Sequence, residues 1–294
     1  MLTVINNTDS LRSLSQIFSP SSFDKAIRAN DIKRIERKVK KYVSSTSTSI
    51  TYKNLINFLY TSLEKDYRSE YFYKNRLLNT LLEKYSLNTT TVLNEFKIGS
   101  SIADFILLNG TARIYEIKTD LDSLDKLNKQ LNDYKQFADL VYIVTSSKYV
   151  TKILSDYSTS TIGVIEFTQD NKFKEYKKAD SNKSYFSHST IFKTLRKPEY
   201  LEIIGSYFGH TPKVPNTEIF KTCFELINKI DVVEFQKIAF NILKKRKIKC
   251  PDSWASNKTP FELKQICYTL DFTNQEYEHL YKFLNKPLKC ISPI

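Results

Sequence analysis

Three residues of this 294-residue chain have the types and spacing of a metal-dependent phosphodiesterase site. Asp104 precedes an Asn-Gly turn signal, and Glu116 and Lys118 follow it on the next strand-like segment. Carboxylate oxygens are ligands that Mg²⁺ and Mn²⁺ prefer, and a nearby lysine can orient or deprotonate an attacking water. The pattern therefore predicts phosphodiester hydrolysis, provided that the fold brings the three side chains together.

The register of this hairpin decides whether they meet. Residues two apart in a strand share a face, so Glu116 and Lys118 point the same way. A two-residue turn would pair Asp104 with Tyr115, on the wrong face. A three-residue loop over 109–111, with a residue at positive φ, pairs Asp104 with Glu116. We predict this second register, or a bulge near Asp104 with the same effect; the alternative is a surface strand with ordinary charged residues.

A third motif follows the hairpin. Gln130 and Tyr134 are four residues apart in a segment with a helical pattern, so one helical face carries both. Asp104, then Glu-x-Lys at 116–118, then Gln-x-x-x-Tyr is the motif order of a known family. Over residues 65–170 the chain resembles the PD-(D/E)XK nuclease superfamily, and most closely its RecB-like branch. One position departs from the superfamily's pattern. Ala103 stands where the superfamily nominally has proline, at a position without a chemical role.

The resemblance implies a restriction-endonuclease-like αβββαβ core and a Mg²⁺- or Mn²⁺-dependent endonuclease acting on DNA. The implied catalytic residues are Glu70, Asp104, Glu116 and Lys118. The implied metal ligands are Asp104, Glu116, Glu70 and the backbone carbonyl of Ile117. The residues expected to contact nucleic acid near the cut are Gln130, Tyr134, Lys126 and Lys129. In this scheme the lysine of the Glu-x-Lys motif positions the attacking water.

Glu70 enters this set because the superfamily places an acid on a helix before the first core strand. Residues 62–85 are predicted to be that helix, and Glu70 follows the three-and-four spacing of its leucine stripe. We therefore expect Glu70 to face inward, toward Lys118 or a metal-bound water. An ion pair with Lys74 at the helix surface is the alternative. Glu83 is a poorer candidate, since it lies roughly 140° away around the helix.

The remaining pattern predicts an α/β fold, a sheet with flanking helices. A continuous apolar run at 140–145 is typical of a central strand buried on both faces. The other predicted strands are 90–98, 101–108, 112–118 and 161–167, with an edge strand at 172–177, and the predicted core helices are 62–85, 124–137 and 147–156. The predicted domains are a basic helical N-terminal arm at 1–50, the nuclease core at 51–180 and a helical C-terminal domain at 181–294.

Both flanks contain basic segments. Residues 23–43 are predicted to form a basic helix, followed by a polar loop at 44–49. This helix is either a DNA-facing arm or a solvated helix packed on the core. The predicted C-terminal helices are 219–230, 233–243, 260–268 and 274–284. The densest basic run, expected to bind nucleic acid, is Lys244, Lys245, Arg246 and Lys247. These helices could instead contact a protein partner or a second copy of the chain.

Composition sets the wider limits. A formal net charge of +13 and a pI near 9.3 suit a polyanionic partner. With five glycines and no glycine-rich phosphate loop, nucleotide-driven motors are disfavoured. No secretion signal or membrane-spanning segment is apparent, so we expect a cytoplasmic protein. Two alternatives remain open: an inactive nuclease fold that binds nucleic acid or a protein, and a toxin or anti-phage effector that acts on RNA.

Overall fold

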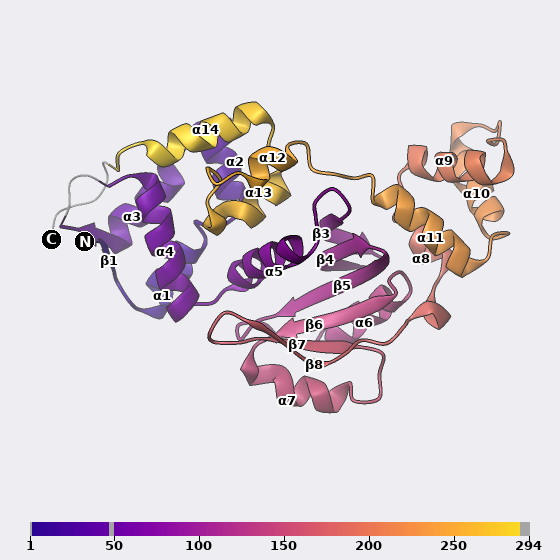
Figure 1. The fold of residues 1–294 in the computed structure, drawn as a ribbon, viewed down its shortest axis with the longest axis horizontal. Coiled ribbons are helices and arrows are strands. Elements are labelled where there is room, and N and C mark those ends of the chain that lie inside the picture. Colours follow the sequence, from indigo (N-terminus) through magenta and orange to yellow (C-terminus); the bar gives the residue numbers. More distant parts are fainter. Residues whose placement is uncertain (1, 47–49, 289–294) are drawn as a thin grey trace. The chain divides into compact units, whose positions relative to one another are not determined.

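The computed structural model describes residues 2–46 and 50–288, and the chain divides into two compact units (Figure 1). The sheet unit is Tyr85–Lys247. The helical unit combines the described residues up to Lys84 with those from Ile248 onward. These boundaries differ from the predicted ones at 50/51 and 180/181, because the C-terminal segment is shared between the two units.

The sheet unit, described throughout, is built on a six-stranded mixed sheet in the order β3-β4-β5-β6-β7-β8. Its strands are β3 (Thr91–Ile98), β4 (Ser101–Asn109), β5 (Thr111–Lys118), β6 (Leu140–Thr145), β7 (Gly163–Phe167) and β8 (Phe173–Lys177). Neighbours are antiparallel from β3 to β5, parallel from β5 to β7, and antiparallel again at β8. The predicted α/β class and the predicted strands are confirmed, with ends that shift by at most two residues.

The hairpin between β4 and β5 has the predicted register. Asn109 pairs with Thr111, Gly110 lies between them at φ +68°, and the ladder runs to Phe105 opposite Tyr115. Glycine adopts this left-handed conformation without steric cost, which allows the tight loop. The next two residues in the same register are Asp104 and Glu116.

One apolar core joins this sheet to the helices of the unit. They are α6 (Leu127–Lys135), α7 (Ser147–Asp156), α8 (His188–Phe192), α9 (Lys197–Phe208), α10 (Asn216–Ile227) and α11 (Val232–Leu243). The core joins sheet residues such as Ile106 and Ile143 to Leu131 of α6 and Phe235 of α11, and all four are at most 1 % exposed. The first half of the predicted C-terminal domain is thus part of the sheet unit, because its buried residues belong to the same apolar core.

The helical unit joins the two ends of the chain. Its helices are α1 (Thr8–Ser15), α2 (Pro20–Arg28), α3 (Lys33–Tyr42), α4 (Tyr52–Asp66), α5 (Glu70–Lys84), α12 (Pro251–Ala255), α13 (Lys264–Leu270) and α14 (Asn274–Asn285). A two-stranded sheet pairs β1 (Leu2–Val4) with β2 (Val43–Ser45). Arg28 bonds Glu276 at 2.6 Å, and Asn57 donates to Glu262 at 2.6 Å, so residues more than 200 positions apart are linked.

Three predictions for the helical unit were wrong in detail. The predicted helix 62–85 spans parts of two helices, because the backbone leaves the helical conformation at Tyr67 (φ −152°, ψ 75°), between α4 and α5. The predicted helix 23–43 is also two, broken where Asn30 adopts a positive φ. The predicted loop 44–49 begins inside strand β2, and residues 47–49 lie outside the described part. Within the described residues, none of the helices has the length and apolarity needed to cross a bilayer.

Candidate active site

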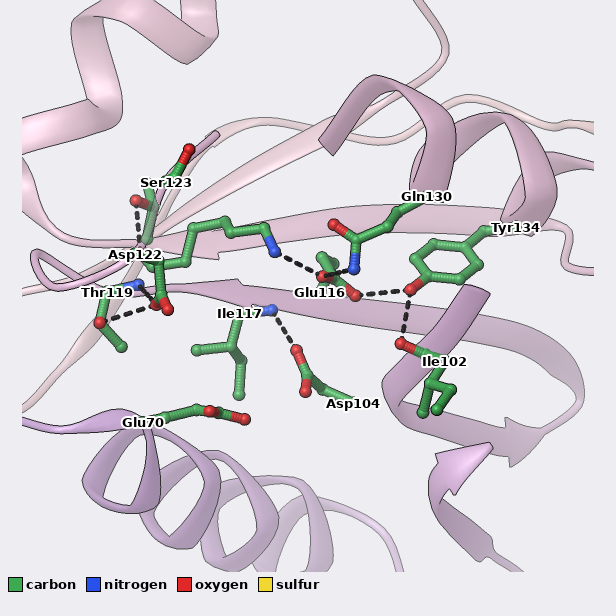
Figure 2. Close-up of polar contacts among 12 residues, drawn as sticks. Glu70, Ile102, Asp104, Glu116, Ile117, Thr119, Asp122, Ser123, Gln130 and Tyr134 are labelled. Carbon is green, nitrogen blue, oxygen red and sulfur yellow. Dashed lines mark hydrogen bonds and ion pairs between the residues drawn. The ribbon is translucent and has the colours of Figure 1, made fainter. Parts of the chain in front are cut away.

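Glu116 is the centre of the candidate site. Its side chain on β5 is 2 % exposed, and its Oε1 accepts from Lys118 Nζ at 2.8 Å and from Gln130 Nε2 at 2.6 Å. Its Oε2 accepts from the Tyr134 hydroxyl at 2.8 Å. Figure 2 shows Gln130 and Tyr134 pointing toward Glu116. The predictions that Glu116 and Lys118 share a face of the strand, and that Gln130 and Tyr134 share a face of the helix, are confirmed.

Tyr134 holds the carboxylate rather than offering a surface to a ligand. It is 0 % exposed, and its hydroxyl lies 2.8 Å from both Glu116 Oε2 and the Ile102 carbonyl. The hydroxyl has one proton for these two acceptors. The expected direct contact between Tyr134 and a nucleic-acid strand was therefore wrong: a buried ring fixes Glu116 against the backbone of β4.

The electrostatics of the pair follow from burial. Burial raises the pKa of Glu116, and the charge of Lys118 with the hydrogen bonds from Lys118, Tyr134 and Gln130 opposes that rise. Burial also raises the pKa of the Tyr134 phenol, and the negative charges of Glu116 and then Asp104 raise it further. Both carboxylates are thus close enough to act on the same hydroxyl.

Asp104 lies at the point where the ladder between β4 and β5 ends. Its side chain is half-buried, and its Oδ2 accepts from the backbone N–H of Ile117 at 2.7 Å (Figure 2). This contact ties Asp104 to the residue between Glu116 and Lys118. The structure therefore brings together Asp104, Glu116 and Lys118, as the motif predicts.

The backbone beyond Lys118 is also fixed. The Lys118 carbonyl accepts from the Thr145 hydroxyl at 2.8 Å, which joins the ends of β5 and β6. Asp122 then accepts from the N–H and the hydroxyl of Thr119, both at 2.7 Å. The lysine is therefore presented from a strand end whose backbone is held on two sides.

Glu95 is a candidate that our sequence reasoning missed. The turn at Gly99-Ser100 pairs β3 with β4 so that Glu95 faces Asp104, and an oxygen of each carboxylate lies within 4.8 Å of the other. Glu95 is exposed and has φ +49°, an uncommon conformation for this residue type. The signal was present, since a two-residue turn at Gly99-Ser100 fixes this register.

The available donors fit a hard cation. Asp104 and Glu95 supply carboxylate oxygens, the preferred ligands of Mg²⁺ and Mn²⁺. The Oε1 atom of Gln130 is buried without a hydrogen-bond partner, beside the amide that donates to Glu116. A buried acceptor of this kind is satisfied by a water or an ion-bound water. Glu116 differs, because it already accepts three hydrogen bonds.

Glu70 does not lie on a buried stripe, contrary to prediction. It is the first residue of α5, its side chain is 48 % exposed, and it forms an ion pair with Lys74. Lys74 itself is buried. The surface ion pair that was the alternative is thus present, and the proposed metal role of Glu70 stays a prediction. The backbone carbonyl of Ile117 also stays a predicted ligand.

The basic residues divide into two groups. Lys126 and Lys129 are exposed near the start of α6, where contact with phosphates stays a prediction. The second group is bonded within the chain. Arg246 donates to both carboxylate oxygens of Glu199, with 2.7 Å between its Nε and Glu199 Oε1, and Lys245 forms an ion pair with Glu202.

Lys247 is also engaged within the chain. It donates to the carbonyls of Leu87, Asn88 and Thr90 at 2.8, 2.9 and 3.1 Å. Arg246 and Lys247 are therefore bonded within the sheet unit, which corrects their assignment as free nucleic-acid contacts, whereas for the exposed Lys245 that assignment stays a prediction. For Lys244 the assignment stays a prediction.

Comparison with known proteins places this chain in a family. The family model described as Bacteriophage P4 protein cII matches residues 63–265. Protein cII of Enterobacteria phage P4 is 28 % identical over 178 residues, which cover 59 % of this chain and 66 % of that protein. The chain thus spans just under two thirds of that relative. The search of solved structures gave no significant match.

Proposed function

The chain belongs to the bacteriophage P4 protein cII family, and we propose that it is a metal-dependent nuclease that hydrolyses phosphodiester bonds in DNA. We further propose that its sheet unit is a PD-(D/E)XK-type core. The supporting observation is the convergence of Lys118, Gln130 and Tyr134 on the buried Glu116 carboxylate, with Asp104 bonded to the intervening residue Ile117.

Burial of the Glu116 carboxylate lowers the stability of the fold, so its presence calls for a functional reason. A carboxylate that is 2 % exposed pays a desolvation penalty, and an apolar residue would fill the site without it. Here the protein meets that cost with three donors from β5 and α6. Buried ionisable groups whose pKa values are shifted gather at functional sites more often than elsewhere. This favours a chemical role for Glu116 over a purely structural one.

Each side chain has a distinct part in the proposed reaction. Bound Mg²⁺ would neutralise charge on the phosphate and lower the pKa of a water. Asp104 and Glu116 would hold the ion, and Glu95 faces Asp104 at the distance expected of a further ligand. Lys118 would orient the attacking water and offset the negative charge that develops. Gln130 and Tyr134 would keep the Glu116 carboxylate in place.

A second function is favoured by one observation. Both oxygens of Glu116 are already engaged by Lys118, Gln130 and Tyr134. If these bonds persist, Glu116 serves as the anchor of a polar network, and the chain is a nuclease-fold protein that binds nucleic acid or a partner without cutting. Fold alone does not separate the two functions.

Incubation of purified protein with plasmid DNA and with RNA separates them. Each substrate is tested with Mg²⁺, Mn²⁺ or EDTA, beside a Lys118→Ala variant. We expect nicked or linear DNA with either metal, none in EDTA, and none with the variant. Salt-sensitive binding without any metal-dependent product would favour the binding function, and cleavage of RNA alone would change the substrate class.

A further inference from the structure

We propose that helix α3 provides a second contact surface for nucleic acid, which binds the phosphate backbone without taking part in cleavage. This cationic face of α3 consists of Lys33, Arg37, Lys40 and Lys41. It belongs to the helical unit, whereas the candidate active site belongs to the sheet unit. The proposal therefore holds whether or not the protein cuts DNA.

The spacing of these residues gathers them on one side of the helix. With 3.6 residues per turn, positions 33, 37, 40 and 41 lie within about 100° of the helix circumference. All four side chains are exposed. Ile35 and Val39, 1 % and 0 % exposed, occupy the opposite side and pack into the helical unit (α3 in Figure 1). The apolar side is thus used for packing, and the cationic side is left to solvent.

The described residues give this face no acidic partners. No acidic group of the described residues lies within 4.0 Å, the limit for an ion pair, of Lys33, Arg37 or Lys40. Lys41 lies over the Tyr42 ring, 5.0 Å from its centroid. The acid within α3, Glu36, instead accepts from the Tyr52 hydroxyl at 2.9 Å. Like charges three or four residues apart destabilise a helix. The fold therefore tolerates a repulsive arrangement without an internal partner.

Lys38 shows how the same helix treats a structural cation. Its ammonium donates to the Ser13 carbonyl at 2.8 Å and to Gln16 Oε1 at 2.9 Å. Burial lowers the pKa of Lys38, and the positive charge of Arg34 lowers it further. The internally bound lysine and the outward-facing cations are thus clearly distinct groups.

A phosphate backbone fits this face better than an anionic membrane. Residues 33 to 41 span about 12 Å at 1.5 Å per residue, and duplex DNA carries one charge per ~1.7 Å of its axis, so several phosphates lie within reach. A helix that binds a bilayer inserts an apolar face, but the apolar residues Ile35 and Val39 are buried in the protein. Contacts of this kind position a protein on nucleic acid and do not read sequence.

Binding of the full chain to a duplex DNA oligonucleotide in EDTA tests the proposal, because cleavage is excluded. The affinity for DNA is measured at salt concentrations from about 0.05 to 0.3 M, the range in which counterion release is resolved. The test variant is Lys33→Gln/Arg37→Gln/Lys40→Gln. The control, Lys25→Gln/Lys65→Gln/Lys282→Gln, removes three exposed lysines of the same unit from three separate helices.

We expect the test variant to lose about tenfold or more in affinity near 0.1 M salt and its log–log salt slope to fall by roughly 2 to 3. The control should change both much less. Equal losses in the two variants would reduce the effect to net charge and overturn the proposal, as would wild-type binding by the test variant. Loss of binding to phosphatidylserine vesicles with unchanged DNA binding would also overturn it, in favour of a membrane partner.

Discussion

The Tyr134 hydroxyl lies 2.8 Å from Oε2 of Glu116, in a position where the tyrosine is 0 % exposed. Tyr134→Phe removes this donor and leaves a buried carboxylate oxygen and the Ile102 carbonyl with fewer partners. We expect a loss of about 1–3 kcal/mol in the free energy of unfolding. Urea unfolding measures it, with Tyr185→Phe at a half-exposed ring as control. Equal stability of both variants would contradict the anchoring role.

The pairing of Glu95 with Asp104 predicts an effect on metal dependence. Glu95→Gln keeps the shape of the side chain but removes a charge within 4.8 Å of the Asp104 carboxylate. The Mg²⁺ concentration for half-maximal cleavage should rise about tenfold or more. Glu175→Gln, at an exposed acid on β8, is the control. A Mg²⁺ titration in which the two variants coincide would remove Glu95 from the site.

The hairpin register was predictable from sequence, and the position of Glu70 was not. Strand alternation and the Asn109-Gly110 signal limit the loop to two choices, and only one brings Asp104 opposite Glu116. The helical stripe around Glu70 was ambiguous because α5 buries residues around most of its circumference, so spacing could not show which side an acid occupies.

The boundaries of the two units and the partners of the basic run at 244–247 could not be predicted from the sequence either. Pro251 marks a break shortly after Lys247, but nothing in the local composition shows that the chain leaves one unit and enters the other at this point. A cluster of basic residues has the same sequence pattern whether its partners are phosphates of a ligand or acidic side chains of the same protein. Arg246 finds Glu199 only because α9 and α11 pack together, a tertiary contact that no local pattern encodes.

The structural part of that basic run is testable. Arg246 and Glu199 are 18 % and 15 % exposed, so Arg246→Ala leaves a largely buried carboxylate unpaired. The free energy of unfolding should fall by about 2–4 kcal/mol. The control is Lys244→Ala, two residues before Arg246 in the chain. Its free energy of unfolding should stay within about 0.5 kcal/mol of the wild-type value. Similar stabilities in thermal unfolding would return Arg246 to the set of free surface cations.

Acid should weaken the same pair. Burial alone would raise the pKa of Glu199, but the hydrogen bonds from Arg246 and the Arg196 backbone outweigh it, so the pKa falls below its usual 4.5. Glu199 binds its proton more weakly in the folded chain, so its stabilisation is present above pH 4.5 and is lost as the pH falls through the lowered value.

Glu199→Gln should therefore be less stable than the wild type at neutral pH, and the difference should shrink in acid. Urea unfolding at neutral, mildly acidic and strongly acidic pH measures that difference. Glu202→Gln, whose side chain is 47 % exposed, should show little difference at any pH. A gap between wild type and Glu199→Gln that does not change with pH would contradict the assignment.

Cleavage by Asp104→Ala tests the central claim most directly. The variant and the wild type are compared on one end-labelled DNA substrate with Mg²⁺, with folding checked by circular dichroism and DNA binding measured in EDTA. We predict a folded variant that still binds DNA and whose cleavage rate is at least about a hundredfold below that of the wild type. Cleavage at the wild-type rate by a folded Asp104→Ala protein would contradict the nuclease site proposed on β4 and β5.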